Sequence, residues 1–251
     1  MQPPATPFDD DELRQITAHG LTPADAAEQL ALMRNPPPPR RLDRAAAIGD
    51  GIAEIPAEEQ ETLVAEGRKA AEEGRVSKFV PASGAATRMF KDLAAALDEW
   101  ESWRQPLHDI AVIRFFRELD RFPFRDSLPA EASAAHSDEE RARVLRTLLR
   151  EPGLGYLTAP KALIPFHRHG STALTPIDEH LAEAAGYCDG GLARVHFTAA
   201  IGARARFTER VAAAALRAGE KFGSEFACEV SVQERAFDTI AVTPAGELMK
   251  N

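Results

Sequence analysis

The sequence predicts an α/β protein built on a three-layer, mainly parallel sheet, with a helical extension before it and a helical insert within it. From residue 76 onward short apolar runs alternate with helical patterns, an order typical of parallel strands covered by helices on both faces. The first 75 residues and residues 104–150 show helical spacing almost throughout. We therefore expect a helical extension over 1–75 and an α/β domain over 76–251, with the insert at 104–150.

In the extension, helices are expected at 9–18, 22–33 and 56–73. Thr22 and Pro23 support the second of these, because threonine is a good N-cap and proline suits the first helical position. The run Pro36–Pro39 is stiff and cannot continue a helix. Gly49–Gly51 indicates a turn between short extended pieces within 45–55.

The α/β domain should contain short apolar strands that are separated by helices. The insert offers one strong start signal, the capping box Ser137–Glu140, which should begin a helix ending near Arg150. Extended apolar runs are expected at 79–82, 162–166, 192–198, 226–232 and 239–242. Helices are expected at 89–100, 107–120, 137–150, 175–187 and 203–218.

Composition limits the function classes. A net charge of −9 and a pI near 5.4 argue against a broad nucleic-acid surface. Two cysteines are too few for a disulfide scaffold, so buried reduced thiols are expected. No secretory signal and no apolar window long enough to span a bilayer is visible. We expect a cytoplasmic protein without a nucleic-acid or membrane partner.

The most informative segment runs from Lys78 to Lys91, where an apolar run is followed by four small residues, Ser83–Ala86, and then by a helical pattern. Such a turn leaves backbone N–H groups free at a helix N-terminus, which favours an anion. Thr87 is expected to cap the helix, and Arg88 supplies a guanidinium suited to phosphate. A phosphate-binding loop and a plain tight turn both remain open at this point.

The turn resembles the signature of nucleotidyltransferases, in which a strand ends in a small-residue loop followed by Thr-Arg-Met. Residues Ala82–Met89 match the pattern Ala-Gly-Gly-x-Gly-Thr-Arg-Met, with Ser83 and Ala86 in place of two glycines. A β-carbon at Ala86 would make a positive φ costlier by roughly 1 kcal/mol. The resemblance implies a Rossmann-like nucleotidyltransferase fold with phosphate contacts from Ser83, Gly84, Ala85, Ala86, Thr87 and Arg88.

A second segment, Pro160–Phe166 followed by Thr175–Leu181, is similar to the next conserved element of sugar-nucleotide pyrophosphorylases, where a Pro-Lys pair ends a loop over the active site. By this resemblance Arg88 and Lys161 are the expected catalytic residues. Their charges would stabilise the negative charge that develops on the leaving pyrophosphate. His167–His169, with its arginine, is interpreted as a positively charged loop facing the phosphates, since ligands at metal-binding spacing are missing nearby.

Over nearly its whole length the chain resembles an uncharacterised bacterial family, the domain of unknown function 4301 (DUF4301) family. The segments that carry this resemblance are His19–Leu21, Ala47–Gly51, Phe79–Phe90, Pro160–Lys161, Thr175–Pro176, Glu179–His180, His196–Thr198 and Asp238–Ala241. The resemblance implies a longer protein, so a chain truncated at its C-terminus is one expectation. The second half would hold the acidic motif that binds Mg²⁺, and the metal ligands in this chain remain unidentified.

Together these patterns predict a protein that binds a nucleoside triphosphate at Ser83–Arg88 and, if active, transfers a nucleotidyl group to a sugar phosphate with Mg²⁺. A non-catalytic phosphate-binding module is the alternative. A glycosyltransferase on a related fold is a third interpretation, and it would need an acidic metal-binding pair near the end of a strand.

Overall fold

The structure, a computed structural model, describes residues 7–188 and 191–249. The outermost ends of the predicted extension and domain, 1–6 and 250–251, lie outside the described residues. By its contacts the chain divides into two units, residues 57–233 and residues 1–56 with 234–251. The patterning suggests one boundary after residue 75, whereas in this division residues 57–75 belong to the larger unit and residues 234–251 belong with the first helices.

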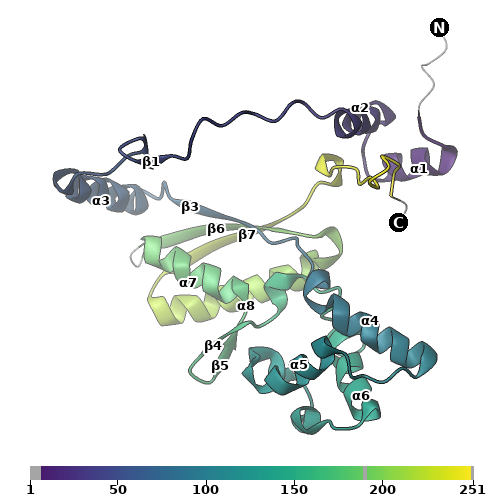
Figure 1. Cartoon of the computed structure of the whole chain (residues 1–251). Helices are drawn as coiled ribbons and strands as arrows, with labels where there is room; N and C mark the ends of the chain where they lie inside the picture. Colours follow the sequence, from purple (N-terminus) through teal and green to yellow (C-terminus); the bar gives the residue numbers. More distant parts are fainter. Residues whose placement is uncertain (1–6, 189–190, 250–251) are drawn as a thin grey trace. The chain divides into compact units, whose positions relative to one another are not determined.

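Within the described residues the chain has eight α-helices and seven β-strands (Figure 1). The helices are α1 (Asp10–Ala18), α2 (Pro23–Arg34), α3 (Ala57–Glu72), α4 (Thr87–Trp103), α5 (Ile110–Glu118), α6 (Asp138–Leu149), α7 (Pro176–Cys188) and α8 (Arg204–Phe222). The strands are β1 (Ala47–Ile48), β2 (Gly51–Ile52), β3 (Ser77–Pro81), β4 (His167–His169), β5 (Thr172–Leu174), β6 (Leu192–Ala199) and β7 (Glu225–Val232). None of the helices in these ranges is long and apolar enough to cross a membrane.

The larger unit is built around a parallel sheet with the strand order β3-β6-β7. Every second residue of β6 is buried, from Ala193 to Ala199, and these side chains meet α7 and α8 in one apolar cluster. Phe197 and Phe207 are both fully buried in this cluster, with ring centroids 6.0 Å apart. The parallel strands and their covering helices confirm the mixed α/β class.

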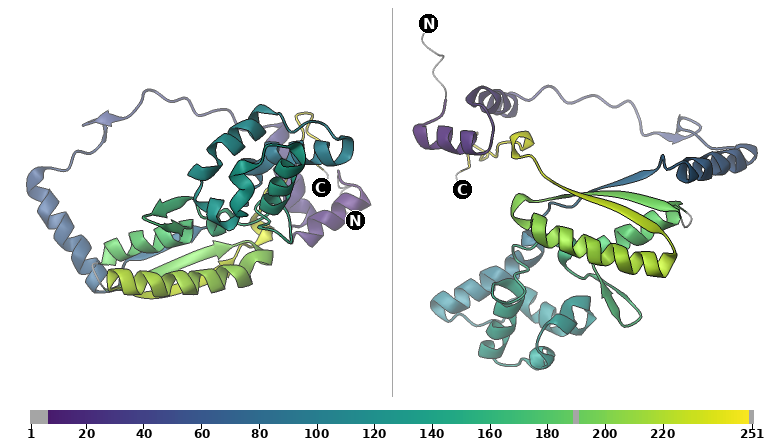
Figure 2. Two further views of the ribbon diagram at one scale, coloured as in Figure 1. Left: turned by 90° about the horizontal axis from the view of Figure 1, so that it is seen from below. Right: turned by 180° about the vertical axis from the view of Figure 1, so that it is seen from behind.

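Both covering helices lie on the same face of the sheet, as the two views of Figure 2 also show. In the described part of this unit no helix covers the opposite face, where Phe79 is 66 % exposed and its ring centroid lies 5.6 Å from that of His196, with the two rings tilted by 32°. His196 also lies within 2.7 Å of the Ser231 hydroxyl. The expected second helical layer is therefore missing from this face. The strict alternation of β6 already indicates one buried and one solvated side.

The insert is longer in the structure than the predicted 104–150, because residues 86–164 form an apolar core of their own around α4, α5, α6 and several 3₁₀ turns. Phe90, Phe124 and Tyr156 pack together, with ring centroids 5.8 to 6.3 Å apart. Helix α6 starts with the predicted capping box, in which Ser137 and Glu140 bond to each other's backbone N–H groups. This clustering places the end of the insert, at residues 157–161, beside the β3–α4 loop.

The expected strand at 162–166 is wrong. Residues Lys161–Leu163 form a 3₁₀ turn, and the extended pair that follows is the antiparallel hairpin β4–β5. The apolar side chains of this run are used for packing, since Ala162 and Ile164 are buried in two different clusters. A short apolar run does not by itself distinguish a strand from a packed turn.

The smaller unit packs α1 and α2 against the last described residues. Phe8, Ile16, Ala26 and Leu30 are buried, and Ile240, Val242 and Leu248 lie against them. The expected strand at 239–242 is also wrong, since only Val242 makes an isolated bridge, to Leu248. The backbone N–H of Ile240 instead donates to the side chain of Gln29 on α2. Capping by Thr22 is confirmed.

Candidate functional site

The β3–α4 loop is held in place by backbone hydrogen bonds at both ends. The N–H of Ala82 donates to the carbonyl of Thr198 at the end of β6, at 2.9 Å. Ala86 donates to the carbonyl of Ala159, at 3.1 Å, and Lys161 donates to the carbonyl of Gly84, at 2.9 Å. The structure thus brings the loop and the Pro160–Lys161 pair together, although they are more than seventy positions apart in the sequence.

Three of the four expected N–H donors in this loop remain available. Within the described chain the N–H groups of Ser83, Gly84 and Ala85 donate to no other group, whereas that of Ala86 is used by Ala159. A β-carbon at Gly84 would meet nothing within 4 Å, so the space above this residue is open. These three groups can therefore approach an anion directly.

The penalty expected from the β-carbon of Ala86 does not arise. Its φ is −84°, an ordinary value for any residue, and its side chain is fully buried in the apolar core of the insert. The β-carbon of Ala86 therefore serves packing in the core of the insert.

The expected cap from Thr87 is wrong. Ala86 is the N-cap of α4, and Thr87 is the first helical residue. The Thr87 hydroxyl donates to the carbonyl of Leu157, at 3.1 Å, so it ties α4 to the end of the insert. The first turn of α4 consequently has no side-chain cap.

Arg88 and Lys161 are both exposed, and within the described residues neither side chain forms an ion pair or hydrogen bond. They are free to contact a ligand near the loop. Neither side chain lines the cavity beside the loop in this structure. Their catalytic role stays a prediction.

That cavity has a volume of about 290 Å³ and lies where β3 and β6 end. Its walls come from the β3–α4 loop, the end of the insert and the β6–α8 turn, namely Ser83, Ala85, Thr158, Ala159, Pro160, Ala200, Gly202, Ala203 and Arg206. In parallel sheets ligands bind at the carboxyl ends of the strands, where helix N-termini converge. The described cavity has this position, with α4 and α8 both starting beside it.

Arg206 and the β6–α8 turn are the members of this site that sequence reasoning missed. The signal was present, because residues 192–218 repeat the order of strand, short turn and helix seen at 79–88, with Ile201 in a turn that otherwise contains small residues. The N-cap of α8 is Ala203, again without a side-chain cap. The parallel pairing of β3 with β6 brings the two turns to the same edge.

The electrostatics of the cavity favour an anion. No carboxylate lines it in the described structure, and neither α4 nor α8 has an acidic residue in its first turn. Arg206 supplies a positive charge whose nearest carboxylate, that of Glu151, is 4.0 Å away and exposed. Two uncapped helix N-termini and a guanidinium form a site that stabilises phosphate or carboxylate groups.

The segment His167–His169, which was predicted to be a loop facing the phosphates, lies elsewhere in the structure. It forms strand β4, where His167 lies 3.3 Å from the carboxylate of Glu179 and Arg168 pairs with Asp126 at 2.9 Å. None of the three residues lines the cavity beside Ser83. Among the described residues no group of three or more His, Cys, Asp or Glu side chains could hold a metal ion.

The family model described as "Domain of unknown function (DUF4301)" matches residues 9–251. The chain belongs to this family. Membership in DUF4301 confirms the resemblance found in the sequence, and it assigns no reaction. No curated protein and no solved structure matches the chain.

Proposed function

We propose that this DUF4301 protein binds a nucleoside triphosphate, with its phosphates in the cavity between the β3–α4 loop and the start of α8. The observation that carries the proposal is the set of free N–H groups at Ser83, Gly84 and Ala85, which lies beside a cavity that holds Arg206 and no carboxylate. Backbone N–H groups at uncapped helix starts bind phosphate in many nucleotide-binding folds.

Each residue has a distinct role in the proposal. The three free N–H groups and Arg206 would hold the phosphate oxygens inside the cavity. Arg88 and Lys161, which are exposed and unpaired in the described chain, would close over the outer phosphates. Thr87 would act indirectly, since its hydroxyl fixes the start of α4 to Leu157.

The order of strand, small-residue turn and Thr87-Arg88-Met89 helix supports a nucleotidyltransferase-like arrangement around β3. The proposal is restricted to this part of the fold, because the second helical layer was not found in the described unit. Transfer of the nucleotidyl group to a sugar phosphate is the corresponding proposed activity.

Such a transfer would use Mg²⁺, and the donor set of the cavity does not fit this ion. Magnesium in such sites is held by one or two carboxylates together with the phosphates, and the described walls offer none. We therefore derive no catalytic step through the metal. The same observation favours a second candidate function, a phosphate-binding module that carries out no transfer.

Thermal unfolding with each of the four ribonucleoside triphosphates, with and without Mg²⁺, tests the binding. A ligand at one hundred times its dissociation constant adds about 2.7 kcal/mol of stability, which raises the melting temperature by about 5 to 10 °C for a chain of this size. The Arg206→Ala variant should lose most of this shift. Arg143→Ala is the matched control, because Arg143 is exposed on α6 and forms no ion pair within the described residues.

Absence of a shift with all four triphosphates would refute the binding. Release of pyrophosphate on addition of a sugar phosphate separates the two candidate functions. An enzyme releases it in proportion to time and protein, whereas the non-catalytic module releases none while still showing the thermal shift.

A further inference from the structure

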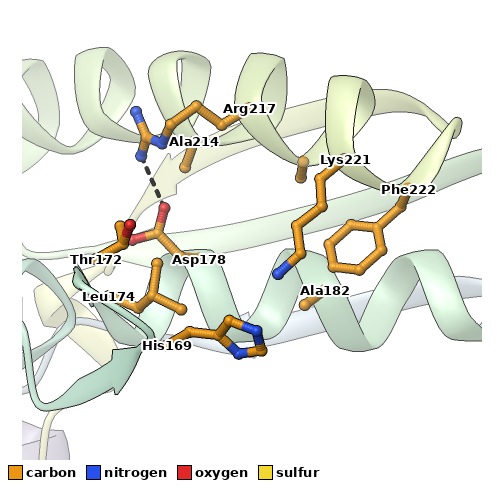
Figure 3. A pocket seen from close by; sticks show the side chains of 10 residues that line it. His169, Thr172, Leu174, Asp178, Ala182, Ala214, Arg217, Lys221 and Phe222 are labelled. Carbon is orange, nitrogen blue, oxygen red and sulfur yellow. Dashed lines mark hydrogen bonds and ion pairs between the residues drawn. The ribbon is translucent and has the colours of Figure 1, made fainter.

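A second cleft lies on the outer side of the helix layer, where the β4–β5 hairpin meets α7 and α8 (Figure 3). Its floor is apolar, because three alanines, Ala182, Ala214 and Ala218, face each other across the two helices. Leu174 on the hairpin and Phe222 at the end of α8 close its sides. Small side chains at these facing positions leave the space that larger residues would fill.

The cleft is separate from the proposed phosphate cavity. Arg206 lines that cavity in the first turn of α8, while Arg217 and Lys221 line this one. Arg217 lies eleven positions after Arg206 on the same helix, a rise of about 16.5 Å at 1.5 Å per residue. No residue is shared between the two linings.

The only carboxylate that lines this cleft in the described structure, that of Asp178, is already neutralised. Its oxygens accept from Arg210 at 2.5 Å, from Arg217 at 2.7 Å and from the Thr175 hydroxyl at 2.7 Å. Burial alone would raise the pKa of Asp178, but these bonds and the charge of Arg210 hold it below its ordinary value. It therefore stays ionised and engaged at neutral pH.

Lys221 has no carboxylate partner. Within the described residues its ammonium forms no ion pair and lies 5.0 Å from the centroid of the Phe222 ring. Figure 3 shows its side chain reaching from α8 toward Ala182 on α7. His169 and Thr172 on the hairpin add polar groups on the other side of the cleft, and the described chain gives neither side chain a hydrogen bond. Arg217 and Lys221 give the lining two positive charges and Asp178 gives it one negative charge, so one monoanion would balance these three groups.

We propose that this cleft binds a small organic carboxylate, whose head contacts Lys221 while its apolar body lies on Ala182, Ala214 and Ala218. The cleft volume of about 180 Å³ is below the 300 to 1,000 Å³ of sites for drug-sized ligands, so the ligand is small. The ammonium of Lys221, which forms no ion pair within the described residues, accounts for the charge of the head, and the alanine floor accounts for the apolar body. An inorganic anion would use only the first of these features.

Titration of the full chain with sodium benzoate, followed by ligand-observed NMR, tests the proposal. Benzamide has the same ring and a similar shape without the charge, and inorganic phosphate has charge without an apolar body. We expect saturable binding of benzoate that is about tenfold tighter than that of either comparison ligand, as one charge-assisted contact of about 1.4 kcal/mol requires. Equal binding of benzamide or of phosphate would overturn the proposal, as would the lack of saturable benzoate binding.

Two variants place the site. Lys221→Gln keeps the aliphatic stem, and Ala182→Leu fills the floor from a half-buried position that tolerates the larger side chain. Each should weaken benzoate binding about five- to tenfold with an unchanged circular dichroism spectrum. Lys69→Gln, on exposed α3, is the control and should bind as the natural protein does. Unchanged affinity in both cleft variants would refute this location even if benzoate binds.

Discussion

Asp178 offers the sharpest test of the packing between α7 and α8, the helices that support the phosphate cavity and the second cleft. Its side chain is 9 % exposed, and it accepts hydrogen bonds from Thr175, the residue just before α7, and from Arg210 and Arg217 on α8. The carboxylate therefore ties together the two helices that cover the sheet. Substituting Asp178→Asn removes the charge and keeps the size and one oxygen acceptor.

The expected cost follows from the exposure of the partners. Breaking a fully buried ion pair costs about 3 to 5 kcal/mol, since a charge is left without a partner. Here the side chains of Arg210 and Arg217 are 31 % and 47 % exposed, so water can solvate them when the carboxylate is lost. Thr175 can still donate to the asparagine oxygen. We expect Asp178→Asn to lower the free energy of unfolding by about 2 kcal/mol at pH 7.

The pH dependence gives the sign of the effect. The folded-state pKa of Asp178 is lowered, so its ionised form stabilises the protein above the unfolded-state value of 3.8. This contribution is lost as the pH falls through the folded-state pKa. Asparagine does not titrate, so the gap between the two proteins should shrink below about pH 4.

Urea unfolding followed by circular dichroism, from pH 7 down to pH 3, measures both quantities. With a slope of about 2 kcal/mol per molar urea, the midpoint should fall by about 1 M at pH 7. Glu179→Gln is the control, because this neighbouring carboxylate is 42 % exposed and pairs only with His167 in the described chain, so its loss should cost less than about 0.5 kcal/mol. A cost below 0.5 kcal/mol for Asp178→Asn at pH 7, or a gap that is the same at pH 3 and pH 7, would contradict the reasoning.

Three further predictions concern other parts of the molecule. Ala203→Asp places a carboxylate at the start of α8, so it should abolish the thermal shift with triphosphates. The protein without ligand should melt no lower than before, and an unchanged thermal shift would argue against triphosphate binding in this cavity. Phe197→Ala should cost about 3 to 5 kcal/mol in urea unfolding because Phe197 is fully buried, whereas Phe79→Ala on the open face should cost under about 1 kcal/mol. Hydrogen bonds from the backbone N–H groups of Ser137 and His136 lower the pKa of Glu140 to about 2, so its contribution to stability is present above pH 4.5 and is lost between pH 4.5 and about 2. Replacing it in Glu140→Gln should make the free energy of unfolding depend less on pH in this range. The same pH dependence in the variant would exclude Glu140 as a cause of acid destabilisation.

The elements that the sequence predicted well are those with a strong local signal. The capping residues Thr22 and Ser137 start helices where expected, because a cap acts within four residues of its own position. Strand β6 lies within one residue of its expected bounds, since a run with every second residue apolar is typical of a half-buried strand. The expected strands at 162–166 and 239–242 had short apolar runs alone, and their packing partners decided otherwise.

In the candidate site, too, some features follow from the local sequence and others from tertiary contacts. The sequence alone determined the order of strand, small-residue turn and helix at 79–88, and with it the presence of N–H groups at a helix start, because these depend on neighbouring residues. Only the tertiary structure decided that the N–H of Ala86 donates to the carbonyl of Ala159 and that the hydroxyl of Thr87 donates to the carbonyl of Leu157. It also decided that the β6–α8 turn brings Arg206 to the same cavity. These contacts join residues seventy or more positions apart. Such partners are chosen by the pairing of β3 with β6 and by the packing of the insert, which no local pattern encodes.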